Sequence, residues 1–328
     1  MLTRASVAMS SHDLVQSEIA LNALQSVAVP PEPELASEII ALRGDLAFYR
    51  GDPAGAARAY RAADALAPSA GTAIRLARLE KSRGEFDSAQ TWLLKGARRG
   101  STITPEFIAG IGLQIGAIDL ARGDYAAAQI RFTEVNDVFP GHWLIEAHLA
   151  QSKALAGDLD GAIALLRELA TRTQSPDLAD SLANMLRAAG REEESREWIE
   201  RSAAIWDARM ARLPEAAVGH ALEHELAFGS PDRSVELAQQ NLVIRPWGGA
   251  HLLMAQAYRK AGEFELAQTH IEKAKSVGIH SAALYAAESE ILTVLGQLAR
   301  AKSARARAKA LNPRIFDPET AFIWFSHG

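Results

Sequence analysis

Two histidines and a glutamate stand close together in the string His-Ala-Leu-Glu-His at residues 220–224. His220 and His224 are four positions apart, so on a helix both would lie on one face. An H-x-x-E-H string can hold zinc through its two histidines while the glutamate, here Glu223, activates water. A third ligand is required, and His251 or Glu225 could approach, although neither spacing matches a known pattern. The string leaves open a metal-binding protein or a metal-dependent hydrolase, beside burial or partner recognition by the same residues.

The composition and motifs of the chain give little support to other kinds of catalytic or cofactor-binding site. The chain has 328 residues, a net charge of −5 and no cysteine, which excludes disulfides and thiolate catalysis. Its glycines are not followed by the Lys-Ser or Lys-Thr of a phosphate-binding loop, and no Ser/His/Asp arrangement can be picked out. We therefore expect a protein without a cofactor that is not an enzyme. A negative chain without long blocks of one sign argues against nucleic acid or an anionic membrane as the main partner.

The apolar stretches are too short to cross a membrane. The most apolar run, from Phe107 to Leu120, is interrupted by Gln114 and Asp119 and falls short of the roughly 20 residues that a span requires. It is better interpreted as a buried helix. The first thirteen residues lack the hydrophobic core of a signal peptide, so the chain as given is expected in the cytoplasm.

A glycine followed by a polar residue recurs along the chain at steps of 33, 39, 34, 33, 39, 33 and 34 residues. In the clearest copy, residues 282–313, this pair separates two apolar patterns of helical spacing, and Asn312-Pro313 ends the second. Glycine there allows the positive φ that ends a helix. The pattern predicts eight helix hairpins with turns at Gly51, Gly84, Gly123, Gly157, Gly190, Gly229, Gly262 and Gly296.

The residues after each turn glycine keep a common register. Five positions after it the side chain is small in all eight copies, which lets the two helices of a hairpin approach closely. Nine positions after it the side chain is bulky and apolar in six copies. The eight small residues are Ala56, Ala89, Ala128, Ala162, Ser195, Ser234, Ala267 and Ala301.

This register resembles the tetratricopeptide repeat, which has a period of about 34 residues and small side chains where its helices cross. The resemblance covers roughly residues 37–315 and implies an all-α solenoid, a right-handed superhelix of about eight hairpins. We expect a capping region in residues 1–36 with a helix over residues 10–29, and an apolar tail over residues 316–328. The two steps of 39 residues place insertions near 100–108 and 203–214, the second as a helix about two turns longer than the norm.

In tetratricopeptide proteins the first helices line an inner groove that takes an extended peptide or a partner helix. The resemblance therefore implies a non-catalytic scaffold or adaptor with a protein or peptide partner. Groove-facing positions lie thirteen, ten, six, three and two residues before each turn glycine. Arginine and lysine there could hold carboxylates, and asparagine could bond an extended backbone. With their neighbours, these positions give the candidate partner-binding residues Asp45, Tyr49, Ile74, Arg75, Arg78, Lys81, Asn184, Arg187, His220, Glu223, Gln256 and Arg259.

The last thirteen residues are rich in aromatic side chains, among them Phe316, Phe322 and Trp324. In one interpretation Pro318 and Glu319 begin a short helix that covers the last hairpin. In the other, the tail enters a groove on a second copy or on a partner. Homo-oligomers formed through the tail, and hence a self-assembling structural protein, are a further functional hypothesis.

Overall fold

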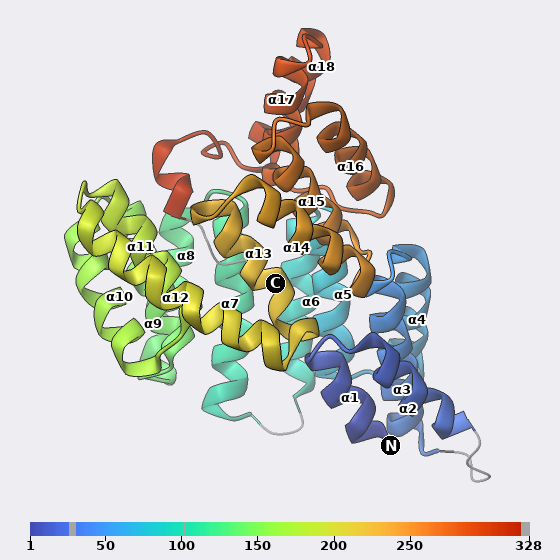
Figure 1. Cartoon of the computed structure of the whole chain (residues 1–328). Coiled ribbons are helices and arrows are strands. Elements are labelled where there is room, and N and C mark those ends of the chain that lie inside the picture. The colour runs from blue at the N-terminus through green and yellow to red at the C-terminus, as the bar shows by residue number, and fades with distance from the viewer. Residues whose placement is uncertain (26–30, 101–102, 323–328) are drawn as a thin grey trace. The chain divides into compact units, whose positions relative to one another are not determined.

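The computed structural model describes residues 1–25, 31–100 and 103–322. In these residues the secondary structure is helical throughout, with eighteen α-helices, one 3-10 helix and no strand (Figure 1). None of these helices has both the length and the apolar character needed to cross a membrane. The all-α prediction is confirmed.

Sixteen of the helices form eight successive hairpins, which we number as repeats one to eight. Repeat one is α3 (Pro33–Tyr49) with α4 (Pro53–Leu66), and repeat two is α5 (Ala70–Ser82) with α6 (Phe86–Arg99). The others are α7 (Pro105–Ala121) with α8 (Tyr125–Val138), α9 (Trp143–Leu155) with α10 (Leu159–Thr173), α11 (Pro176–Ala188) with α12 (Glu192–Arg212), α13 (Pro214–Phe228) with α14 (Pro231–Ile244), α15 (Gly248–Lys260) with α16 (Phe264–Ser276), and α17 (Ala282–Val294) with α18 (Leu298–Leu311).

The turn glycines behave as the sequence predicts in seven of the eight hairpins. Their φ angles lie between 71° and 92°, a region that is open to glycine and strained for other residues. Gly229 is the exception, with φ −94°. In that hairpin Ser230 caps α14 and Pro231 begins it, so the chain turns without a left-handed residue.

The small residues five positions after each turn glycine are buried where the paired helices meet. All eight are 5% exposed or less. Because a larger side chain at these points would force the helices apart, the predicted register is confirmed in every copy.

A second size relation links the two helices of one hairpin. Where the residue nine positions after the turn glycine is aromatic, as in Tyr60 and Phe132, a glycine stands seven positions before the turn. A methyl group on Gly44 would collide with the ring of Tyr60, and one on Gly116 with the ring of Phe132. Repeat six has the opposite arrangement, with Leu222 before the turn and Ala238 after it. The volume at the crossing is therefore shared between two fixed positions.

The helices form two compact units, each described here by itself. Unit one contains residues 1–100 and 213–305, and unit two contains residues 101–212 and 306–328. In unit one, repeats far apart in the sequence touch each other. The ring centroids of Tyr49 and Trp247 are 5.7 Å apart, and the amide of His280 donates to the carbonyl of Ser82 at 2.8 Å. Unit one thus joins an early and a late stretch of the chain.

The N-terminal region has two helices where the sequence predicts one. They are α1 (Leu2–Ser10) and α2 (Leu14–Gln25), and the end of the predicted helix, residues 26–29, lies outside the described residues. His12 lies between them with φ 61°, a left-handed conformation that ends α1 and allows the chain to reverse. Leu14 and Leu21 then pack with Leu42 of α3 in one core cluster.

Helix α12 has 21 residues, whereas the second helices of the other repeats have 13 to 15. Its extension is packed at least as far as Trp206, which is 3% exposed. The indole Nε1 of Trp206 donates to Asp180 of α11 at 2.9 Å. The extension of α12 therefore covers part of α11.

Candidate peptide-binding surface

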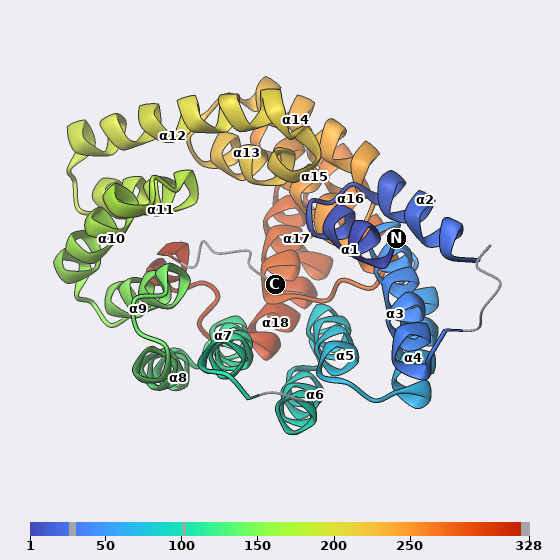
Figure 2. The same cartoon turned by 90° about the horizontal axis from the view of Figure 1, so that it is seen from below.

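The chain after α18 lies against repeats three to five in unit two, where it meets the turn and the start of α8 in repeat three and the first helices of repeats four and five. We call residues 312–322 the tail segment. It ends in the 3-10 helix η1 (Pro318–Phe322), which contacts α9 and α11 (Figure 2). Asn312 is 2% exposed and lies against the turn of repeat three, where a methyl group on Gly123 would collide with its Oδ1.

Two side-chain amides hold the end of the tail segment, and we call them the amide pair. Nε2 of Gln151 donates to the carbonyl of Phe322 at 2.9 Å, and Nδ2 of Asn184 donates to the carbonyl of Ala321 at 3.0 Å. Each residue stands six positions before the turn glycine of its repeat. Equivalent positions in successive repeats therefore bind successive backbone carbonyls.

The orientation of Gln151 is fixed from behind. Its Oε1 lies 3.1 Å from Nδ1 of His148, one turn earlier on α9. His148 is 3% exposed and stacks on Phe132 of the preceding repeat, with ring centroids 4.5 Å apart. If Nδ1 of His148 carries the proton, the glutamine oxygen is the acceptor and its NH₂ group must point to the tail. In that tautomer, the bond with His148 directs the NH₂ group of Gln151 at the carbonyl of Phe322.

Tyr125, at the start of α8, forms a third point of attachment. The guanidinium of Arg314 lies over its ring, 4.4 Å from the centroid, and its hydroxyl is 3.2 Å from Oγ1 of Thr320. Within the segment, Nε of Arg314 donates to Asp317 at 2.9 Å and Thr320 donates to the carbonyl of Arg314 at 2.7 Å. The bond to Asp317 raises the pKa of Arg314. The segment is therefore preshaped by its own bonds as well as held by the surface.

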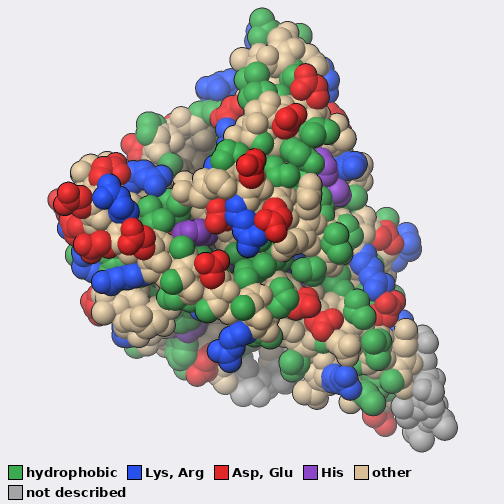
Figure 3. All heavy atoms as spheres, viewed as in Figure 1, with side chains coloured by type: hydrophobic (Ala, Val, Ile, Leu, Met, Phe, Trp, Pro, Cys, Tyr) green, Lys and Arg blue, Asp and Glu red, His purple; other side chains and the backbone are tan. Residues whose placement is uncertain are grey.

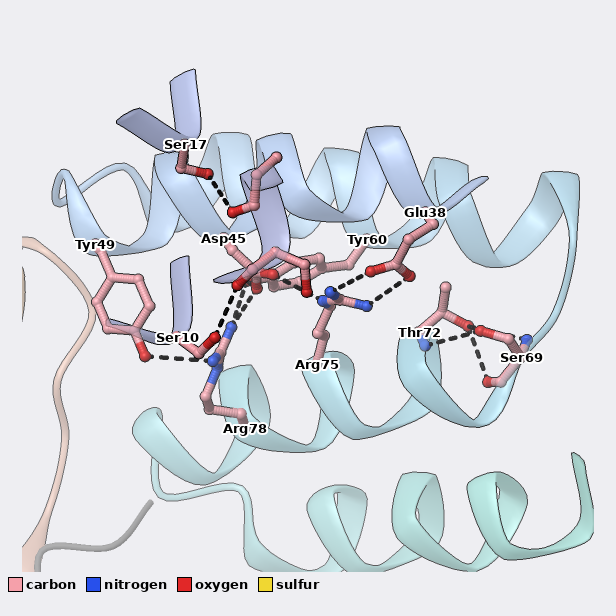
Figure 4. Close-up of polar contacts among 12 residues, drawn as sticks. Ser10, Ser17, Glu38, Asp45, Tyr49, Tyr60, Ser69, Thr72, Arg75 and Arg78 are labelled. Atoms are coloured by element: carbon pink, nitrogen blue, oxygen red, sulfur yellow. Dashed lines mark hydrogen bonds and ion pairs between the residues drawn. The ribbon is translucent and has the colours of Figure 1, made fainter. Parts of the chain in front are cut away.

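In unit one, several predicted groove residues form a polar cluster with one another (Figure 4). Asp45 accepts hydrogen bonds from the hydroxyl of Tyr60 at 2.8 Å, from Nε of Arg75 at 2.9 Å and from Nη2 of Arg78 at 2.5 Å. Arg75 also donates twice to Glu38, at 3.1 and 2.7 Å. We call these five residues the Asp45 cluster, and it joins α3 and α4 to α5.

Two aromatic rings lie against Arg78 of this cluster. The guanidinium of Arg78 lies 5.0 Å from the ring centroid of Phe48 and 5.4 Å from that of Tyr49. Burial opposes the charge of Arg78, but Tyr60, Tyr49 and Asp45 outweigh it and raise its pKa. Burial also raises the pKa of Tyr60, which keeps its hydroxyl proton at neutral pH. In the structure, Asp45, Tyr49, Arg75 and Arg78 thus serve the packing of repeats one and two.

The H-x-x-E-H string lies on α13. Nδ1 of His220 is 3.5 Å from a carboxylate oxygen of Glu223, whereas His224 is 5% exposed and packs against the ring of Phe228. His251 faces His270 instead, with their Nδ1 atoms 3.1 Å apart. Burial and Lys273 lower the pKa of both histidines of this pair, that of His270 to about 4.

Among the described residues, no group of three or more His, Cys, Asp or Glu side chains is arranged to hold a metal ion. His220 and His224 therefore lie one turn apart on α13 but in different surroundings. The zinc hypothesis gains no support from the structure.

The remaining predicted groove residues are scattered. Ile74, Lys81 and Gln256 are half-buried, and burial lowers the pKa of Lys81. Arg187 is exposed, and Arg259 is exposed and pairs with Glu290 at 3.2 Å. On the face shown in Figure 3, basic and acidic side chains are interspersed.

Sequence reasoning predicted Asn184 and missed its partner Gln151, although both stand at the same register position. Applying the position six residues before each turn glycine to every repeat would have found it. Lys260, the last residue of α15, donates from its ammonium to the carbonyls of Leu226 and Gly229 at 3.0 and 2.8 Å and so caps the end of α13.

Solved structures of other proteins share this fold. No protein-family model matches the sequence, and the search of curated proteins found no match. Among solved structures, yeast Tom70 is similar with a TM-score of 0.54 and 13% identity over 95% of this chain and 62% of the Tom70 chain. A Rap protein is similar with a TM-score of 0.52 and 11% identity over 94% of this chain and 96% of its own.

A tetratricopeptide repeat protein from Parabacteroides merdae is also similar, with a TM-score of 0.44 and 16% identity over 78% of this chain and 96% of that one. At such identities the likeness concerns the fold. The eight hairpins of this chain agree with the fold of the similar solved structures. The chain is a tetratricopeptide-repeat-like, all-helical repeat protein.

Proposed function

We propose that this chain is a non-catalytic interaction protein that binds a peptide segment of a partner on the inner helices of repeats three to five. The observation that carries this proposal is the contact of the amide pair with the carbonyls of Ala321 and Phe322. A polypeptide lies on that surface and is held through its backbone. Side-chain amides that bond a backbone accept many sequences, which suits recognition of a segment rather than catalysis.

The fold supports the same proposal. A repeat built from local contacts presents a long preformed surface, so little ordering is required when a ligand binds. The Rap protein of similar fold was solved in a complex with competence and sporulation factor. In repeats four and five, the residue six positions before the turn glycine, one of the positions that the register assigns to the inner groove, bonds the tail segment.

The test uses a fluorescently labelled peptide with the sequence of residues 312–322, followed by fluorescence anisotropy. The chain's own tail makes the same contacts, so the binding protein carries Arg314→Ala and Thr320→Ala, which remove the contacts with Tyr125. Adding Asn184→Leu removes one hydrogen bond, worth about 1 kcal/mol, and is expected to weaken binding about fivefold. The matched control is Gln240→Met on the exposed surface of α14.

A peptide that binds with unchanged affinity after Asn184→Leu, or that binds to no variant, would refute the proposal. Gln151→Met in the same background gives an independent check, because Gln151 lies on a different helix. Circular dichroism establishes that each variant keeps its helical content.

A further inference from the structure

We propose that the tail segment is a built-in competitor for the surface of repeats three to five, and that a partner binds by displacing it. The partner is a protein segment that offers the same groups: an arginine, a hydroxyl residue six positions later and two consecutive backbone carbonyls after that. This inference rests on the proposed function and adds to it both the chemistry of the ligand and its regulation.

Three separate contacts seat the tail segment. Asn312 lies against the turn of repeat three, Arg314 stacks on Tyr125, and the end of η1 meets the amide pair on repeats four and five. The contacts span three successive repeats, from the turn and the start of α8 in repeat three to the first helices of repeats four and five. A tail that only covered apolar surface would need no side-chain amides directed at its backbone.

The amide groups themselves point to a competitive arrangement. Backbone carbonyls are present in every peptide, so the amide pair cannot distinguish the tail from another segment. Discrimination must come from side-chain contacts, among them those with Tyr125, where the guanidinium of Arg314 lies 4.4 Å from the ring centroid and the Thr320 hydroxyl lies 3.2 Å from the phenol. A partner that supplies an aromatic-stacking cation and a hydroxyl can replace both.

The attachment of the tail makes it a strong competitor despite its few contacts. Only residues 312–319 separate the end of α18 from Thr320. A ligand on so short a tether has an effective concentration on the order of millimolar. If the tethered and the free segment bind with similar intrinsic dissociation constants of about 10 to 100 micromolar, the tail weakens apparent binding of a free peptide by roughly 10- to 100-fold.

The test compares the unmodified chain with the Arg314→Ala, Thr320→Ala chain, using the same labelled peptide. We expect the doubly substituted chain to bind at least tenfold more tightly. Lys309→Ala, an exposed change on α18, serves as the control and is expected to leave the affinity unchanged. Equal affinity for the unmodified and the doubly substituted chain would overturn the competitor while leaving the proposed function intact.

A second measurement depends on competition alone. In the unmodified chain, Asn184→Leu weakens the tail and the free peptide together, so the apparent affinity should change less than twofold. In the doubly substituted chain the same change should weaken binding about fivefold. A fivefold loss in both backgrounds would refute the competitor, and no loss in either would refute the proposed function itself.

Light scattering separates the intramolecular from the intermolecular arrangement. A monomer at all concentrations is expected, because the tail satisfies its own surface. A concentration-dependent dimer that is lost in the Arg314→Ala, Thr320→Ala chain would overturn the inference, since the tail would then serve a second copy.

Discussion

Replacing Asp45 with alanine is expected to loosen the packing of repeats one and two more than any change at the surface. Asp45 is 4% exposed and accepts hydrogen bonds from Tyr60, Arg75 and Arg78. Without the carboxylate, two arginines lose their shared counter-charge. Removing one partner of a buried pair costs about 3–5 kcal/mol.

The structure places the expected value near the lower end of that range. The side chains of Arg75 and Arg78 are 16% and 24% exposed, so water can replace part of what is lost. Arg75 keeps Glu38, and Arg78 keeps the hydroxyl of Tyr60 at 2.8 Å. A loss of about 3 kcal/mol corresponds to a rise of roughly 100- to 200-fold in the local opening equilibrium.

Hydrogen exchange measures this effect where it occurs. Repeat proteins open locally, so amides of α3 to α5 report the change without a two-state assumption for the whole chain. Asp45→Asn keeps an acceptor but removes the charge, and should give an intermediate loss of protection. Asp137→Ala, an exposed change on α8, is the control. Equal protection of α5 in Asp45→Ala and Asp137→Ala would show that the cluster does not hold these helices together.

Three further changes test other contacts. Gly116→Ala places a methyl group against the ring of Phe132 and should lower the free energy of unfolding by about 1–3 kcal/mol. Adding Phe132→Leu should restore part of this stability. No recovery would contradict the size relation between residues 116 and 132. Burial, with Arg245, His220 and Arg78 nearby, lowers the pKa of His12 to about 4. As the pH falls, His12 is therefore protonated in the unfolded chain before it is protonated in the folded chain. The free energy of unfolding should fall as the pH drops from about 6.5 toward 4. His12→Asn, which tolerates the same positive φ, should flatten that slope in urea titrations, and an unaltered slope would count against it. Lys260→Met removes the cap of α13 and should lower the urea midpoint by an amount equivalent to about 1 kcal/mol, whereas no shift would show that the carbonyls are satisfied by water.

The repeat could be predicted from the sequence because its determinants are local. A glycine that ends one helix, a small residue five positions later and a proline that ends the next helix act within a few turns of chain. The exception, Gly229, follows the same reasoning, since Ser230 and Pro231 supply another way to begin a helix. Local rules therefore give each hairpin its bounds.

The candidate surface was less predictable because contacts between distant stretches decide it. The register assigns Asn184 to the face of α11 that it predicts for the groove, but it does not show that the chain's own Ala321 reaches it. The same holds for Asp45 and Arg78, whose bonds to each other cannot be seen from a register that treats every repeat separately. Pairing His251 with His270 also depends on how α15 packs on α16, and the sequence pointed to His220 and His224 instead.

The size relation between Gly44 and Tyr60, and between Gly116 and Phe132, affects how such a protein can be rebuilt. A whole hairpin can be moved to another place in the array because it carries both halves of its own fit. A single helix cannot, since the second helix of repeat three would bring Phe132 against Ala77, the residue of repeat two that corresponds to Gly116. For recombination, in nature or in the laboratory, the smallest transferable module is therefore the pair of helices.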